Sequence, residues 1–171
     1  MRLIYVFILI SFFCALSTDL QAQDKHYTVS YFAGKTPFNN NNVSFDVIKF
    51  GIEKELPYLI SGINASLGRY QGVFEFSDTN WIAVGPYWDF WRSGVGRFSF
   101  EFAPTYIDND FIAGHFVAGR WHFTSSLEYT FTPKLTQPIQ WGIRYQHTSN
   151  GGTGSPNPGI DGVGAFVELK W

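Results

Sequence analysis

Cysteine is nearly missing from this sequence. Of the 171 residues only Cys14 is a cysteine, and it lies in an N-terminal segment with the features of a secretory signal peptide. The bulky Phe12 and Phe13 precede it where a lipoprotein signal would have small residues, so lipidation of this cysteine is not expected. A mature chain without cysteine excludes disulfides, thiol catalysis and metal sites with cysteine ligands.

The signal peptide is predicted to span residues 1–22. Arg2 is followed by a short apolar run, and Leu20-Gln21-Ala22 then offers the small-residue chemistry of a cleavage site. A retained transmembrane anchor is the alternative, but the run is short for a membrane span and a cleavage site follows it. The mature domain is therefore predicted to be residues 23–171.

Charged residues are also scarce. They make up 15% of the chain, whereas aromatic residues make up 19%. Ordinary soluble domains carry roughly 25% charged residues. After the signal peptide there is no convincing helical period and no apolar run of membrane-spanning length. The excess of aromatic over charged residues instead predicts a surface that faces lipid.

What the chain does contain is segments of alternating apolar and polar residues, separated by clusters of Gly, Asn, Asp and Pro. Eight such segments are predicted to be strands: residues 26–33, 43–52, 58–67, 79–90, 95–106, 113–131, 138–149 and 161–171. The second segment is irregular, because Asp46 and Lys49 fall on opposite faces; a bulge or a shifted boundary would explain this.

The two faces of these strands differ in a way that indicates the fold. In the fifth segment Phe98, Phe100 and Phe102 share one face, and Arg97 and Glu101 share the other. The same pattern recurs in the sixth segment, where Val117 and Trp121 are expected on the apolar face. A bulky apolar face opposite a face of Gly and mixed charges is typical of a transmembrane barrel.

The predicted fold class is all-β, an eight-stranded antiparallel transmembrane β-barrel of the bacterial outer membrane. Hydrocarbon cannot satisfy an open sheet edge, so the sheet must close. A barrel of this size is too narrow for a channel. The following charged residues are expected to fill its lumen as a paired network: Arg97, Glu101, Arg120, Glu128 and Arg144. A soluble lipid-binding barrel of lipocalin type is an alternative, and it would turn the bulky face inward.

The seventh strand carries the candidate chemistry. His147 and Ser149 continue the register of the apolar residues of that strand. A histidine is the usual base for a serine nucleophile, and this spacing separates the two Cα atoms by roughly 6–7 Å. Counting back from Trp171 places Asp161 on the same face of the last strand, where it completes a Ser-His-Asp set. The alternative is that all three are polar residues at a membrane rim.

Strand count places this set at one end of the barrel. With both termini in the periplasm, the seventh strand ends at the cell-exterior rim, and residues 150–160 form an extracellular loop. His122 and Thr124 form a second pair of a histidine and a hydroxyl residue. They lie on the same face of their strand as Glu128, so they are expected to face the lumen and to belong to its structural network.

The motif around these residues resembles a known family. Residues 143–152, I-R-Y-Q-H-T-S-N-G-G, followed by N-P-G-I-D-G at 157–162, are similar to the signature of the PagL family of outer-membrane lipid A 3-O-deacylases. The resemblance implies that Ser149 is the nucleophile and His147 the base. Asp161 falls where the family commonly has Glu, so the acid is shorter by one methylene.

The resemblance also implies roles for the loop that follows Ser149. Asn150 and Asn157 match polar positions beside the family's active site, and an Asn amide or a backbone N–H of Gly151 or Gly152 can stabilise an oxyanion. The alternative is turn chemistry, in which Asn-Gly and Asn-Pro are common.

The predicted function is that of a serine esterase that removes an ester-linked 3-hydroxyacyl chain from the 3-position of lipid A in the outer leaflet. No metal or organic cofactor is expected. The expected partners are lipopolysaccharide and the surrounding outer-membrane lipids, with no nucleic acid; homodimerisation is left open. Trp141 and Tyr145 are expected to contact acyl chains or simply to pack against the membrane. The alternative function is a non-enzymatic barrel for adhesion or envelope integrity.

Overall fold

The computed structural model describes residues 26–37, 43–56, 60–71, 78–112, 115–131 and 138–171. The predicted signal peptide, residues 1–22, lies outside the described residues and stays a prediction. Within the described ranges, no helix is long and apolar enough to cross a membrane.

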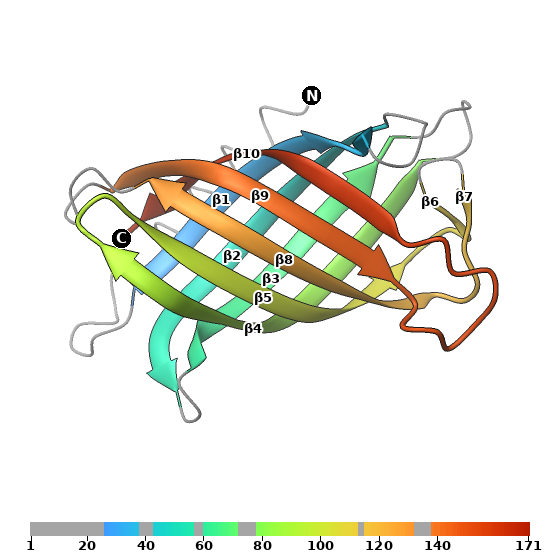
Figure 1. Ribbon diagram of the computed structural model, residues 1–171, viewed down its shortest axis with the longest axis horizontal. Coiled ribbons are helices and arrows are strands. Elements are labelled where there is room, and N and C mark those ends of the chain that lie inside the picture. Colours follow the sequence, from blue (N-terminus) through green and yellow to red (C-terminus); the bar gives the residue numbers. More distant parts are fainter. Residues whose placement is uncertain (1–25, 38–42, 57–59, 72–77, 113–114, 132–137) are drawn as a thin grey trace.

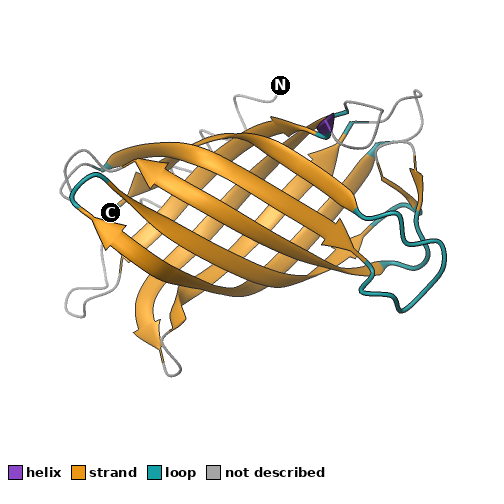
Figure 2. Cartoon of the chain, in the orientation of Figure 1, coloured by secondary structure: helices purple, strands orange, loops and turns teal. Residues whose placement is uncertain are grey.

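The described residues form ten strands: β1 (His26–Lys35), β2 (Ser44–Leu56), β3 (Ile60–Tyr70), β4 (Thr79–Ser93), β5 (Gly96–Ile107), β6 (Phe111–Ile112), β7 (His115–Phe116), β8 (Trp121–Phe131), β9 (Ile139–Ser149) and β10 (Ile160–Lys170). Eight of them close into a barrel in the order β1-β10-β9-β8-β5-β4-β3-β2, and β6 pairs with β7 in a separate small sheet. All neighbouring strands in the barrel are antiparallel. The predicted eight-stranded antiparallel barrel is confirmed, and Figure 2 shows that strands make up nearly all of it.

The barrel has two distinct ends. Residues 150–159 connect β9 to β10 at one end, which we call the distal end, and the β6–β7 hairpin lies at the same end (Figure 1). The other end, which we call the proximal end, carries Trp171, whose backbone pairs with Tyr27 at the start of β1.

The sixth predicted strand was wrong in its first half. The barrel strand begins at Trp121, and the residues before it turn away into the β6–β7 hairpin. Gly119 has a φ of 82°, a left-handed conformation that ends the extended run. As a result Val117 is buried in the interior rather than outward-facing. Arg120 is not part of the luminal network: it is partly exposed and pairs with Asp110 at 3.2 Å.

The irregularity in the second predicted strand has a different cause from those expected. The pairing of β2 with β3 is regular from Phe45 to Glu53, so neither a bulge nor a shifted boundary separates Asp46 from Lys49. Asp46 lies on the outer face, where it accepts a hydrogen bond from the hydroxyl of Tyr31 at 2.9 Å. Lys49 faces the lumen.

The outer wall of the barrel is apolar. Every barrel strand contributes at least one large apolar side chain that is 42% to 55% exposed, and these include Tyr31, Ile52, Leu67, Val84, Phe102, Leu127, Ile143 and Val167. Buried positions, by contrast, are rich in polar and charged residues. The bulky face therefore points outward, opposite to what a lipocalin-type barrel requires, and fits a wall that contacts hydrocarbon.

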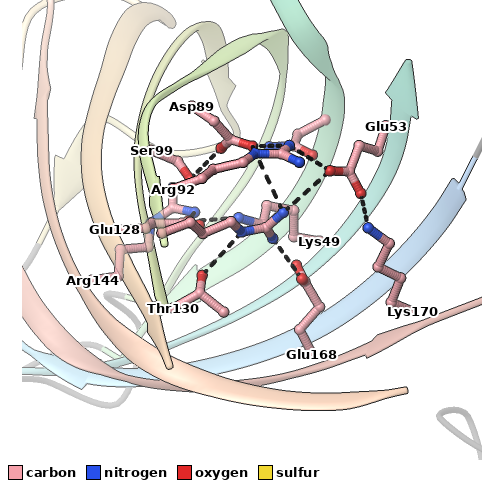
Figure 3. Close-up of polar contacts among 12 residues, drawn as sticks. Lys49, Glu53, Asp89, Arg92, Ser99, Glu128, Thr130, Arg144, Glu168 and Lys170 are labelled. Carbon is pink, nitrogen blue, oxygen red and sulfur yellow. Dashed lines mark hydrogen bonds and ion pairs between the residues drawn. The ribbon is translucent and has the colours of Figure 1, made fainter. Parts of the chain in front are cut away.

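The proximal half of the lumen is filled by paired charges (Figure 3). Glu128 Oε1 lies 2.5 Å from Lys49 Nζ and 2.7 Å from Arg144 Nη1. Arg97 Nη2 lies 2.7 Å from Glu168 Oε1. The cavity left among them measures about 10 Å³, which is room for about one water molecule. The predicted network is thus confirmed for four of its five members, Arg97, Glu101, Glu128 and Arg144.

The distal half of the lumen is an apolar and aromatic core. Phe45 and Tyr70 lie with their ring centroids 5.3 Å apart, and Tyr70 and Trp81 lie 6.3 Å apart. Ile112 from the β6–β7 hairpin and Ile160 from β10 are fully buried in the same cluster. This packed core backs the part of the wall in which β9 ends and β10 begins.

Candidate active site

His147 and Asp161 face each other across the outer wall at the distal end of β9 and β10. They are directly opposite in the strand register. His147 Nδ1 lies 2.9 Å from Asp161 Oδ1, and the two side chains are 39% and 28% exposed. An imidazole whose Nδ1 contacts a carboxylate has its other nitrogen, Nε2, available to act on a neighbouring group.

Asp161 is held by a second donor as well. The hydroxyl of Tyr145, two residues before His147 on β9, donates to the same oxygen, Oδ1, at 2.5 Å. Sequence reasoning assigned Tyr145 only a membrane or acyl-chain contact. Strand parity shows that the side chain of Tyr145 faces outward, but it does not show which group its hydroxyl contacts.

Ser149 lies two residues beyond His147 on the same face of β9, opposite Phe123 of β8. Among the described residues, no hydrogen bond joins Ser149 Oγ to His147. Catalytic hydrogen bonds are often long in ligand-free enzymes and shorten when substrate binds. The arrangement therefore supplies a formed His-Asp pair with a serine next to it along the strand.

Ser125 is a second hydroxyl near the imidazole that sequence reasoning missed. It sits on β8 directly opposite His147, on the side away from Asp161. Directly opposite residues have Cβ atoms about 4.5–5.5 Å apart. The parity of Phe123 and Leu127 already places Ser125 on the outer face; its alignment with His147 appears only in the pairing of β8 with β9.

The imidazole of His147 packs against Gly159. Gly159 is buried and has a φ of 62°, a conformation that side chains rarely adopt. A Cβ atom at this position would lie 2.8 Å from His147 Cε1. The absence of a side chain at Gly159 therefore lets the loop run directly beside the ring.

The loop that follows Ser149 is tied together by Asn150. Its buried amide nitrogen donates to the carbonyls of Ala118 at 3.2 Å and Gly154 at 3.0 Å, and its Oδ1 accepts from the N–H of Gly152 at 3.0 Å. The backbone N–H of Asn150 donates to Asn157 Oδ1 at 3.0 Å. These contacts give both asparagines a structural role, and their oxyanion roles stay predictions.

Gly151 differs from its neighbours in this loop. It is exposed, has a φ of 63°, and its N–H has no acceptor among the described residues. Asn150 and Gly152, its neighbours on either side, use their backbone N–H groups in hydrogen bonds to asparagine side chains of the same loop.

The inner face of the same wall is fixed by hydrogen bonds. Gln146 Nε2 donates to the hydroxyl of Tyr70 at 2.9 Å, and the hydroxyl of Thr148 lies 3.2 Å from the same atom. His122 and Thr124 face inward, as predicted: His122 is 1% exposed, and Thr124 lies 3.0 Å from Thr148. Among the described residues, no group of acidic, His or Cys side chains could hold a metal ion.

Comparison with known proteins assigns the chain to a family. The model of the PagL family, described as lipid A 3-O-deacylase, matches residues 19–170. The chain belongs to the PagL family. It is therefore a hydrolase of esters and an outer-membrane β-barrel that deacylates lipid A. This membership excludes the non-enzymatic barrel considered above.

A solved structure of a PagL enzyme has the same fold. The crystal structure of the outer membrane enzyme PagL superposes with a TM-score of 0.65 at 15% identity, and the match covers 83% of this chain and 98% of that one. The Yersinia pestis outer membrane protein Ail, solved in a phospholipid bilayer nanodisc, gives a TM-score of 0.45 at 11% identity over 86% of this chain and 98% of that one. A search of curated proteins finds no match.

The wall around the candidate site suits the acyl chains on which a PagL protein acts. Phe123 and Leu127 on β8, Tyr145 on β9 and Val163 on β10 are each between 37% and 44% exposed. They lie on the outer face beside His147. An acyl chain lying along the wall would thus contact apolar side chains while its ester reaches the polar residues at the distal rim.

Proposed function

We propose that this PagL protein removes the ester-linked 3-hydroxyacyl chain at the 3-position of lipid A, with Ser149 as nucleophile, His147 as general base and Asp161 as the orienting acid. The observation that carries this proposal is the His147–Asp161 pair, formed at 2.9 Å on an apolar outer wall with Ser149 beside it. Such a triad on a lipid-facing surface has access to a substrate that stays in the membrane.

The distal end is proposed to face the cell exterior. Both barrel termini lie at the proximal end, which would then face the periplasm. The three residues would sit at the level of the outer leaflet, where lipid A resides. This orientation is supported by the polar loop at 150–159, which is longer than the β4–β5 turn at the proximal end, because the longer loops of outer-membrane barrels face the cell exterior.

In the first half of the reaction, Ser149 Oγ attacks the ester carbonyl and its proton passes to His147 Nε2. The Nδ1–H of His147 stays directed at Asp161, which stabilises the imidazolium. The N–H of Gly151 is the donor proposed for the tetrahedral oxyanion. The intermediate breaks the bond to the sugar oxygen, which leaves with the proton from His147.

In the second half, His147 takes a proton from water, and the hydroxide attacks the acyl-serine. The bond between the acyl carbon and Ser149 Oγ then breaks, and His147 returns its proton to that oxygen, so that a free 3-hydroxy fatty acid leaves and Ser149 is regenerated. The shorter acid reaches far enough for this role, because Asp161 already contacts the imidazole.

The test is mass spectrometry of lipid A from cells that make the wild-type protein, Ser149→Ala or Ser125→Ala. Wild type and Ser125→Ala should yield lipid A that lacks one 3-hydroxyacyl chain, located at the 3-position by fragmentation. Ser149→Ala should yield intact lipid A. Deacylation that persists in Ser149→Ala and disappears in Ser125→Ala would assign the nucleophile to Ser125 instead.

A further inference from the structure

The hydroxyl of Tyr145 contacts Asp161, although Asp161 is not the residue directly opposite Tyr145 on the neighbouring strand. The residue opposite Tyr145 on β10 is Val163, and Asp161 lies two residues before Val163 on that strand. The tyrosine side chain therefore runs diagonally along the outer wall to reach Oδ1 of Asp161 at 2.5 Å. Diagonal neighbours on antiparallel strands are within reach of aromatic side chains.

Two donors meet on one oxygen of Asp161. His147 Nδ1 and the Tyr145 hydroxyl both contact Oδ1, and both come from β9. A carboxylate at a partly exposed position can otherwise turn toward solvent. A hydrogen bond from a hydroxyl to a carboxylate is charge-assisted and about twice as strong as a neutral one, so it restrains the rotation of Asp161.

We propose that Tyr145 is a positioning residue for the deacylation: its hydroxyl holds Asp161 in the orientation that contacts His147. This inference rests on the proposed triad and deepens it. It gives a physical reason why a short acid suffices in this chain, because a second strand-borne donor fixes it.

The competing role for Tyr145 is contact with acyl chains alone. Its ring is 42% exposed on the apolar wall, so a contact with substrate would need the ring but not the hydroxyl. Tyr145→Phe separates the two roles because it keeps the ring. If the hydroxyl positions Asp161, loss of its hydrogen bond to the charged carboxylate should lower kcat by about tenfold to a hundredfold.

The barrel also contains a matched control. Tyr31 donates to Asp46 at 2.9 Å on the same outer wall, and Tyr31 is 49% exposed. The residue two positions beyond Tyr31 on β1 is Ala33, so no histidine takes the place that His147 has beside Tyr145. Tyr31→Phe thus removes a tyrosine–aspartate hydrogen bond without touching the triad.

The experiment measures kcat and KM for lipid A hydrolysis by the purified full-length protein in detergent, per folded barrel, with folding read from heat-modifiable gel mobility. Tyr145→Phe should lower kcat about tenfold to a hundredfold with KM nearly unchanged, and Tyr31→Phe should match wild type. Full activity in Tyr145→Phe, a raised KM with unchanged kcat, or an equal loss in Tyr31→Phe would overturn the proposal. Ser149→Ala is measured in parallel, because its residual activity decides the proposed nucleophile independently of Tyr145.

Discussion

His147 and Asp161 are direct partners across β9 and β10, with Nδ1 and Oδ1 2.9 Å apart. Both residues belong to strands of a closed barrel, so the backbone on each side of the pair is fixed by hydrogen bonds. The nucleophile candidate Ser149 is the last residue of β9, and only the oxyanion candidates lie on a loop. The relative position of the base His147 and the acid Asp161 is therefore fixed by two hydrogen-bonded barrel strands.

Replacement of the acid tests whether Asp161 orients His147. Asp161→Asn should leave the barrel intact and lower kcat by orders of magnitude, since an amide cannot stabilise the imidazolium or fix its tautomer. Asp46→Asn is the matched control, because Asp46 is also an outward-facing aspartate bonded to a tyrosine. Lipid A hydrolysis by the two purified variants measures the difference; near-normal turnover in Asp161→Asn would mean that another group orients the histidine.

The close contact between Gly159 and the imidazole makes a second prediction. Gly159→Ala should displace the ring and strain the loop, because the added Cβ would lie 2.8 Å from His147 Cε1 at a φ of 62°. We expect a fall in kcat with the barrel still folded. Gly119→Ala introduces a side chain at a similar φ of 82° with nothing within 4 Å, so it isolates the backbone strain. Equal activity of the two variants would show that the contact with the ring does not matter.

The face on which each side chain lies was predictable from the sequence, because the two-residue alternation of a strand depends only on neighbouring residues. It placed His147, Ser149 and Asp161 on one outer wall and His122 in the lumen. Relations between strands were not predictable in the same way. Neither the alignment of Ser125 with His147 nor the reach of the Tyr145 hydroxyl to Asp161 follows from parity, because both depend on strand register and side-chain direction.

The sixth predicted strand shows the limit of the same period. The register of Val117 continues to Trp121 across Gly119, although Phe116 and Ala118 are apolar residues on the opposite parity. The left-handed backbone at Gly119 ends the strand, and Arg120 consequently pairs with Asp110 at the rim rather than entering the lumen.

The luminal network predicts a stability effect that is separate from activity. Glu128→Ala leaves Lys49 and Arg144 without their shortest contacts in a buried site, so the free energy of unfolding should fall by about 3–5 kcal/mol. Asp110→Ala breaks an exposed ion pair with Arg120 and should cost less than about 1 kcal/mol. Urea titrations followed by tryptophan fluorescence measure both values. Similar values for the two variants would contradict a structural role for the network.

The most direct test of the central claim is covalent labelling of the nucleophile. A fluorophosphonate with a long alkyl chain is added to the purified protein, and trypsin is then expected to cleave after Arg120, Lys134 and Arg144. Ser125 and Ser149 thus fall in different peptides, and tandem mass spectrometry locates the adduct. We predict a single adduct on Ser149 that is lost in His147→Ala. An adduct on Ser125, or labelling of Ser149 that persists without His147, would contradict the account.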